Sequence, residues 1–180
     1  MKRFLSLIMV LALLTGCATV FQEGARPVTS IKQTTVEGAL KDGKIYYKPS
    51  YHKSGMLRWQ YVLNEIVTPS EKMLEFEKIF IKETRRLFKE KGYELILVDK
   101  PSEKLPVYIE MRFGFLHGSA LTSSVGATRW FVYINGQHVL EIYNWRINQF
   151  IGALGGVSET ATAEVAEITI EDFFEYFKNN

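Results

Sequence analysis

Histidine and cysteine are scarce in this chain of 180 residues, which contains three histidines and a single cysteine, Cys17. One thiol excludes a disulfide within the chain, so the fold must be stabilised by packing alone. The histidines, His52, His117 and His138, show no metal-ligand spacing such as that of HExxH. We therefore expect no metal site.

Motifs of catalysis and of phosphate binding are also missing. Gly118-Ser119 and Ser123-Ser124 lie in a stretch of small residues, but His117 stands where a GxSxG elbow would need a glycine. The glycines of the segment 152–156 precede an expected helix, where backbone N–H groups can bind phosphate, yet there is neither a P-loop lysine nor a GxGxxG motif. The sequence therefore predicts that the protein is not an enzyme and carries no cofactor.

The chain starts with two cations, Lys2 and Arg3, and an apolar run from Phe4 to Leu14 that is too short to span a bilayer. This is the layout of a secretory signal peptide. The residues Leu14-Thr15-Gly16-Cys17 resemble the lipobox of bacterial lipoproteins, in which an aliphatic and two small residues precede the lipidated cysteine. The resemblance implies a diacylglyceryl group on the Cys17 thiol, cleavage after Gly16 and acylation of the new amino terminus. An uncleaved apolar anchor and ordinary secretion are the alternatives.

The resemblance also implies a location. Ala18, rather than an acidic residue, follows Cys17, which in the enterobacterial pattern favours the outer over the inner membrane. Acyl chains such as palmitate on Cys17 would anchor the protein there, facing the periplasm. Cleavage would remove Lys2 and Arg3 from the 22 basic residues, leaving 20 against 20 acidic residues. The mature protein would then have no basic field to bind nucleic acid.

We divide the chain into a signal peptide (1–16), a lipidated tether (17–30) and one α+β periplasmic domain (31–180). The tether is expected because residues 18–30 show no hydrophobic periodicity. A flexible segment of that length has an end-to-end distance of roughly 20 Å, which would keep the domain close to the membrane.

Two helices are predicted. The first begins at Thr68-Pro69-Ser70-Glu71, a capping box with Thr68 as the cap, and ends at Gly92. The second covers roughly residues 158–178 and is capped by Ser158 or Thr160. The buried side of the first helix is predicted from apolar residues at helical spacing, namely Met73, Phe76, Phe80, Thr84, Leu87 and Phe88.

Strands are predicted over 44–48, 58–67, 93–98, 107–116, 129–134 and 137–147, with a loop at 49–55. Asn135-Gly136 between the last two strands is a strong signal for a two-residue hairpin turn, because both turn residues take positive φ. This turn pairs Ile134 with Gln137 and Tyr133 with His138. It would also place Val132 opposite Val139 and Trp130 opposite Glu141. Both faces of the hairpin hold large apolar groups, so one face should meet helices and the other must meet something else.

These elements predict an α+β fold, an antiparallel meander of three to four strands with two helices packed on one face. The aromatic residues Trp130, Tyr143 and Trp145, with Trp59 and Tyr61, are expected to belong to the core. The alternative is that they form a sheet face or groove that receives an apolar ligand or a partner.

The loop before the last helix is unusually apolar. Its residues Phe150, Ile151, Leu154 and Val157 form a candidate contact site for lipid or another protein, and the alternative is a buried connector. In layout the chain resembles small accessory lipoproteins of envelope machineries. We therefore expect a non-catalytic binding or assembly module of the cell envelope, with an envelope protein as its partner. The alternatives are a carrier of a small apolar ligand or lipid and an envelope hydrolase.

Overall fold

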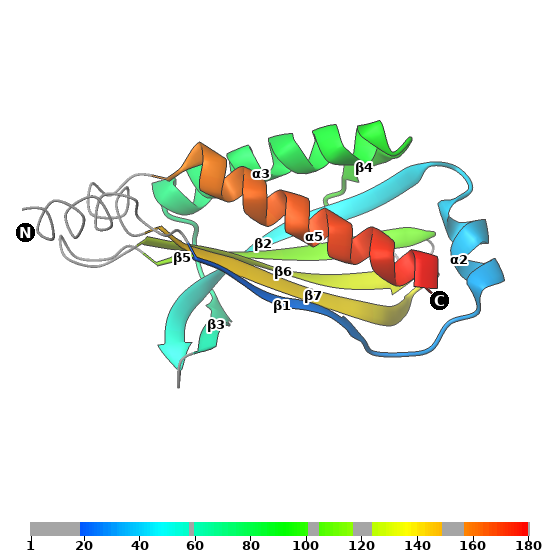
Figure 1. The fold of residues 1–180 in the computed structure, drawn as a ribbon, viewed down its shortest axis with the longest axis horizontal. Coiled ribbons are helices and arrows are strands. Elements are labelled where there is room, and N and C mark those ends of the chain that lie inside the picture. Colours follow the sequence, from blue (N-terminus) through cyan, green and yellow to red (C-terminus); the bar gives the residue numbers. More distant parts are fainter. Residues whose placement is uncertain (1–18, 58–59, 101–104, 117–123, 149–156, 180) are drawn as a thin grey trace, which may run out of the picture.

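The structure is a computed structural model that describes residues 19–57, 60–100, 105–116, 124–148 and 157–179. The strands are β1 (Thr19–Pro27), β2 (Lys44–Leu57), β3 (Gln60–Ile66), β4 (Glu94–Leu97), β5 (Val107–Leu116), β6 (Ser124–Ile134) and β7 (Gln137–Asn148). The helices are α2 (Gln33–Leu40), α3 (Glu71–Glu90) and α5 (Glu159–Asn179). The strands form one mixed seven-stranded sheet in the order β1-β7-β6-β5-β2-β3, with β4 beside β2. The long helices α3 and α5 lie side by side across one face of this sheet (Figure 1).

The α+β class predicted from the sequence is confirmed, but the sheet is larger than the predicted meander of three to four strands. It has seven strands, and β2 runs parallel to both β4 and β5. A third helix, α2, was not predicted. Helix α2 contains Thr34, Thr35 and Gly38, which are weak helix formers, and it is stabilised by burial of Val36 and Ala39.

Strand β2 continues through residues 49–55, where a loop was predicted. Its first half lies between β4 and β5, and its second half pairs with β3. Pro49 has no N–H to donate, but its nitrogen is on the side of β4, where the pairing with β2 ends at Tyr47. No sheet hydrogen bond is therefore lost at Pro49.

Strand β1 occupies most of the segment that was predicted to be a tether. Residues 19–27 pair with β7 in an antiparallel register that runs from Thr19 opposite Ile147 to Pro27 opposite Leu140. The register shifts next to Gly24, whose positive φ of 76° suits a bulge. Main-chain pairing with a distant strand stabilises this segment, and such pairing leaves no hydrophobic periodicity in the sequence.

Helix α3 begins later than predicted. Its N-cap is Ser70, whose Oγ accepts a hydrogen bond from the Met73 N–H at 3.3 Å, so the prediction of Thr68 as the cap was wrong. The predicted buried side and the left-handed Gly92 at the end, with φ of 85°, are confirmed. In α5, Ser158 is the cap, since its Oγ accepts from the Ala161 N–H at 3.2 Å.

Replacing Ser70 with alanine should therefore lower the free energy of unfolding by about 1 kcal/mol. For a domain of this size the melting temperature should fall by a few degrees. Thermal unfolding followed by circular dichroism measures the shift. Thr68→Ala is the matched control and should leave the melting temperature unchanged, and a larger loss from Thr68→Ala than from Ser70→Ala would contradict the assignment of the cap.

The β6–β7 hairpin has the predicted turn and an unpredicted bulge. Asn135 and Gly136 take φ of 49° and 81°, and Tyr133 lies opposite His138 as expected. Beyond that pair, Val132 lies opposite Leu140, so Val139 is an extra residue in β7. Trp130 therefore faces Ile142 and not the predicted Glu141. From Leu140 to Trp145, the side chains of β7 lie on the face opposite to the one predicted.

The core lies between the helices and the sheet. Trp130 is fully buried at its centre, and its ring centroid lies 6.1–6.3 Å from those of Phe80 and Phe88 on α3 and of Phe173 on α5. Helix α3 is also joined to β2 by Tyr51 Oη, which donates to Glu77 at 2.7 Å. These contacts fix both long helices to the same side of the sheet.

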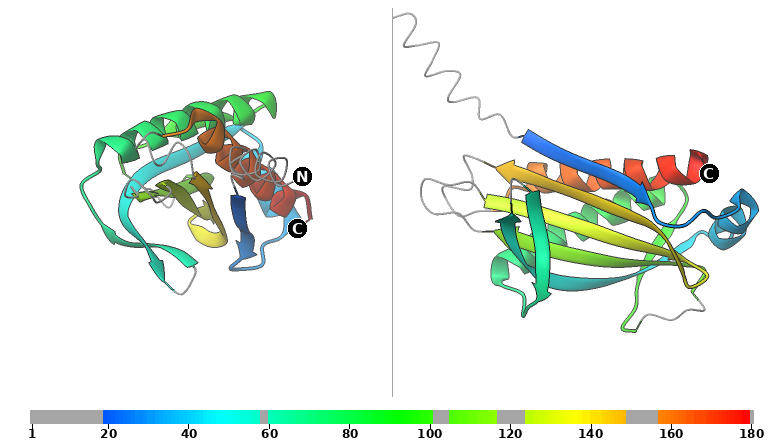
Figure 2. Two further views of the ribbon diagram at one scale, coloured as in Figure 1. Left: turned by 60° about the vertical axis from the view of Figure 1, so that its left-hand side comes forward. Right: turned by 90° about the horizontal axis from the view of Figure 1, so that it is seen from below.

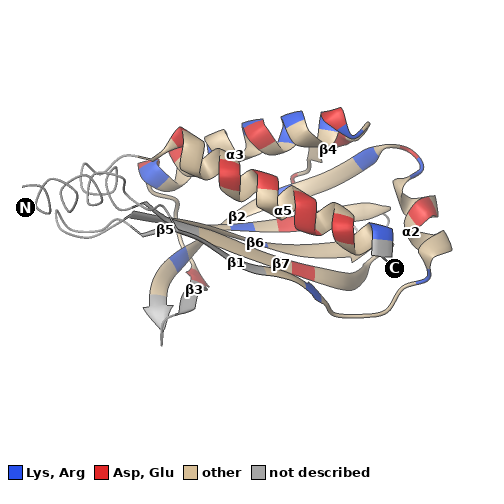
Figure 3. Cartoon of the chain, viewed as in Figure 1, with Lys and Arg blue, Asp and Glu red and all other residues tan. Residues whose placement is uncertain are grey.

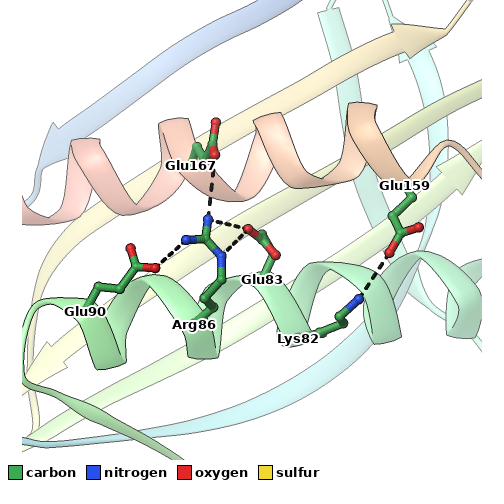
Figure 4. A network of polar contacts seen from close by, with 6 residues as sticks. All are labelled: Lys82, Glu83, Arg86, Glu90, Glu159 and Glu167. Carbon is green, nitrogen blue, oxygen red and sulfur yellow. Dashed lines mark hydrogen bonds and ion pairs between the residues drawn. The ribbon is translucent and has the colours of Figure 1, made fainter.

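Charged side chains cover the outer surfaces of the two long helices. Acidic residues line α5, and both signs occur along α3 (Figure 3). The helices are joined by Lys82 to Glu159 at 3.2 Å and by Arg86 to Glu167 at 3.8 Å (Figure 4). These pairs are largely exposed, so each contributes little to stability. This surface is a solvated helix face.

Candidate functional site

The predicted contact residues fall mainly outside the part of the chain that the structure describes. Cys17, Phe150, Ile151 and Leu154 all lie outside the described residues. The remaining member, Val157, is half-buried and packs against the main core. Among the described residues, no helix is long and apolar enough to cross a membrane.

The predicted aromatic group does not form one surface. Trp130 lies under the helices, whereas Tyr143 and Trp145 lie on the other face of the sheet, opposite Arg129 and Ala127. The bulge at Val139 causes this separation, because one extra residue exchanges the two faces of β7. Of the other two members, Tyr61 belongs to β3 and Trp59 lies outside the described residues.

The face of the sheet that the helices leave uncovered is the candidate functional site, and we call it the open sheet face (Figures 1 and 2). It carries a mixture of charged, aromatic and imidazole side chains from the adjacent strands β5, β6 and β7. Its central members are Tyr108, Glu110, Arg112, Arg129, Phe131, Tyr133, His138, Glu141 and Tyr143.

Two arginines dominate the centre of the open sheet face. Arg112 on β5 lies directly opposite Arg129 on β6, a like-charge pair that would be destabilising on its own. Each guanidinium is paired with a carboxylate: Arg112 Nε donates to Glu110 at 2.7 Å, and Arg129 donates to Glu141. The pairs neutralise the two cations and hold them in place.

Both guanidinium groups also cover Phe131. The Cζ atoms of Arg112 and Arg129 lie 4.0 and 5.1 Å from the centroid of the Phe131 ring, which is only 9% exposed. Cations over an aromatic face are attracted by its quadrupole. Phe131, a large apolar group of the β6–β7 hairpin, is therefore shielded from water by charged side chains.

Aromatic stacking continues along the strands. The Tyr133 ring lies 5.8 Å from Tyr108 and 5.0 Å from His138, which confirms the cross-strand pair predicted for His138. Burial, with the nearby Glu110 carboxylate, raises the pKa of Tyr108 to about 12. Burial also raises the pKa of Tyr133. Both phenols therefore stay protonated at neutral pH and can donate hydrogen bonds.

The β2–β3 hairpin covers the other end of the open sheet face. Leu63 of β3 packs against Ala127 and Trp145. Close approach of the hairpin needs the absence of a side chain at Gly114, where an added Cβ would lie 2.1 Å from Leu63 Cδ2. At this end the hairpin provides the cover that the sequence required for the second face.

The polar groups of this region do not form a recognisable catalytic or metal site. Among the described residues, no group of three or more His, Cys, Asp or Glu side chains could hold a metal ion. The Ser50 hydroxyl and His52 Nε2 lie 3.1 Å apart, a distance that suits a nucleophile and its base, but the His52 residue is only 3% exposed. His138 Nε2 lies 3.8 Å from Glu141, which is already paired with Arg129.

Two hollows occur elsewhere on the described surface. One lies between α2 and the end of α5 and includes Lys41 and Lys178 in its lining. The other lies between α3 and β4 and includes Arg85 and Lys89. Both linings mix these charged side chains with apolar ones, which are Val36, Leu40, Phe174 and Phe177 in the first hollow and Leu95, Ile96 and Leu97 in the second.

Comparison with known proteins assigns no family. No protein-family model matches the chain, and no curated protein matches it. Among solved structures, it is similar to a PelC dodecamer from Paraburkholderia phytofirmans, with 10% identity and a TM-score of 0.49 over 86% of this chain and 97% of that chain. A variant of the same dodecamer has 9% identity and a TM-score of 0.48, over 86% of this chain and 95% of that chain. The crystal structure of an uncharacterized protein has 11% identity and a TM-score of 0.42, over 74% of this chain and 92% of that chain. At this level of similarity, none of these structures assigns a residue or an activity to the chain.

Proposed function

We propose that the protein is a lipoprotein of the bacterial cell envelope, anchored in the outer membrane through acyl chains on Cys17 and facing the periplasm. It acts there as a non-catalytic binding or assembly module for an envelope protein. The observation that carries the proposal is the sequence Leu14-Thr15-Gly16-Cys17 behind a short apolar run and two cations. Three acyl chains would make the attachment effectively permanent.

The open sheet face supports the binding role. Arginine and tyrosine are enriched in protein interfaces, and this face presents Arg112, Arg129, Tyr133 and Tyr143, each partly exposed. These residue types on the open sheet face therefore support a protein partner.

Lipidation is tested by replacing Cys17 with serine. The variant should remain uncleaved and should incorporate no radioactive palmitate, because serine cannot receive the thioether-linked lipid. Metabolic labelling followed by immunoprecipitation measures both effects. Thr15→Ser retains a small residue in the motif and should be labelled and cleaved normally. Palmitate label that persists in Cys17→Ser would refute the anchor.

The binding role is tested by cross-linking in intact cells and purification of the acylated protein from membranes. We expect one envelope protein to be recovered in a constant ratio to the chain. The charge-reversed pair Arg112→Glu with Arg129→Glu should reduce that ratio, because it places four carboxylates on the open sheet face. A variant altered only on the solvated helix face, Lys82→Glu, is the control. Recovery of the chain alone would contradict the assembly role.

A further inference from the structure

The start of β1 leaves almost no free chain between the lipidation site and the folded domain. Thr19, the first residue of β1, is already paired with Ile147. Only Ala18 separates it from Cys17, and two residues span at most about 7 Å. If Cys17 is acylated, as proposed above, the end of the sheet must therefore lie next to the membrane surface.

Several elements share this end of the domain, which we call the anchor end. Leu116, at the end of β5, lies opposite Val125 near the start of β6. Ser124 at the start of β6 lies opposite Asn148, the last residue of β7. The first residue of β1 and the last residues of β5 and β7 thus lie together at one end of the sheet, where these strands begin or terminate (Figure 1).

Both long helices begin at the anchor end as well. In α5, Tyr176 Oη donates to the Val139 carbonyl at 3.3 Å, whereas Asp172 accepts from Asn144 Nδ2 at 2.9 Å. The carboxyl end of α5 therefore lies beside the start of β7, and Glu159 lies towards the end of β7. In α3, Phe76 contacts Phe115 near the end of β5.

The opposite end of the domain is formed by α2 and the Asn135-Gly136 turn (Figures 1 and 2). Strand β7 joins the two ends with 12 residues, from Gln137 to Asn148. At about 3.3 Å per residue, the strand separates the turn from the anchor end by roughly 35 Å.

We propose that the acylated protein stands on the bilayer with its anchor end against the lipid headgroups, so that the Asn135-Gly136 turn and α2 are held roughly 35 Å further from the surface. The lipid surface is the partner of the anchor end. The outer face of α5 is unsuited to contact with anionic lipid because the exposed Glu167, Glu171 and Glu175 would be repelled. On the open sheet face, Arg112 and Arg129 are neutralised by Glu110 and Glu141.

The test compares two single-cysteine positions on α5 in the acylated protein purified from membranes. Glu159→Cys lies at the anchor end and Lys178→Cys at the far end, about 28 Å along the helix. Acylated Cys17 has no free thiol, so each variant binds one thiol-reactive donor dye. The proteins are reconstituted into vesicles of phosphatidylethanolamine and phosphatidylglycerol that carry an acceptor on the headgroups. Energy transfer should be several-fold more efficient from position 159 than from position 178.

A second pair on α3, Glu71→Cys and Lys91→Cys, should show the same order, because α3 also begins at the anchor end. Equal transfer within both pairs would overturn the upright orientation and show that the domain lies along the surface. Stronger transfer from positions 178 and 91 would overturn it by showing the inverted orientation. Two dyes per chain would reveal a free thiol at Cys17, which refutes the lipid anchor itself and with it this inference. The dye count thus separates failure of the anchor from failure of the orientation.

Discussion

Replacing Trp130 with alanine should lower the free energy of unfolding by about 3–5 kcal/mol, the cost of removing a large aromatic side chain from a packed core. Trp130 is fully buried, and its ring lies against Phe80 and Phe88 of α3 and Phe173 of α5. Trp130 therefore joins the sheet to both long helices through ring contacts. The cavity left by alanine would be lined by rigid rings that cannot close it.

Urea unfolding at equilibrium measures this loss of stability. Two further variants test whether the loss comes from the packing of Trp130 in the core. Trp130→Phe should cost much less than alanine, because the phenyl ring keeps most contacts and removes an indole N–H that has no partner among the described residues. Tyr143→Ala, on the open sheet face and half-buried, should also cost less. A loss from Tyr143→Ala as large as that from Trp130→Ala would show that the core is not centred on Trp130.

Replacing Asn144 with alanine should lower the free energy of unfolding by about 2–3 kcal/mol, the upper range for hydrogen bonds to charged groups. Asn144 is fully buried on β7 and faces α5. Its Nδ2 donates to the Asp172 carboxylate at 2.9 Å and to Thr169 Oγ1 at 3.2 Å. Alanine would remove a donor from a carboxylate that is itself largely buried.

Two further variants distinguish the carboxylate contact from the hydroxyl contact. Thr169→Val should cost less than Asn144→Ala, because the Asn144–Asp172 bond remains. The double change Asn144→Leu with Asp172→Leu should recover much of the loss, since replacing both members of a buried polar pair by apolar groups can be nearly neutral. Denaturant unfolding compares all the variants. A double variant less stable than Asn144→Ala would show that Asp172 is needed for other contacts.

The elements that the sequence predicted well are those whose signal is local. Helix α3 follows from Met73, Phe76, Phe80 and Phe88 at helical spacing, and β5 from alternation between Val107 and Leu116. The Asn135-Gly136 turn follows from the φ values that those two residues accept. Each of these patterns is contained within about 20 neighbouring residues and does not depend on the rest of the chain.

The elements that were missed depend on distant partners. Strand β1 and the second half of β2 are stabilised by main-chain pairing, which leaves little trace in side-chain order. The bulge gave no signal either, because Val139 and Leu140 are both apolar and both become buried. Without the bulge, the sequence could not place Tyr143 and Trp145 on the correct face.

The open sheet face was only partly predictable. The sequence showed that both faces of the hairpin hold large apolar groups, which correctly required a second covering element. It did not show that Arg112 and Arg129 would lie opposite each other, because that contact depends on the register between β5 and β6. The position of the two guanidinium groups over Phe131 could therefore not be predicted from the sequence.

The pairing of β1 with β7 also sets the order in which the sheet can be completed. Thr19 and Ile147 are 128 positions apart in the chain, and closing so long a loop is slow. During synthesis, β1 is made early, and nearly the whole domain must follow before its partner strand β7 exists. Until then β1 keeps unpaired hydrogen-bonding groups that other chains could bind. β1, the first strand to be made, is thus among the last to find its partner in the sheet.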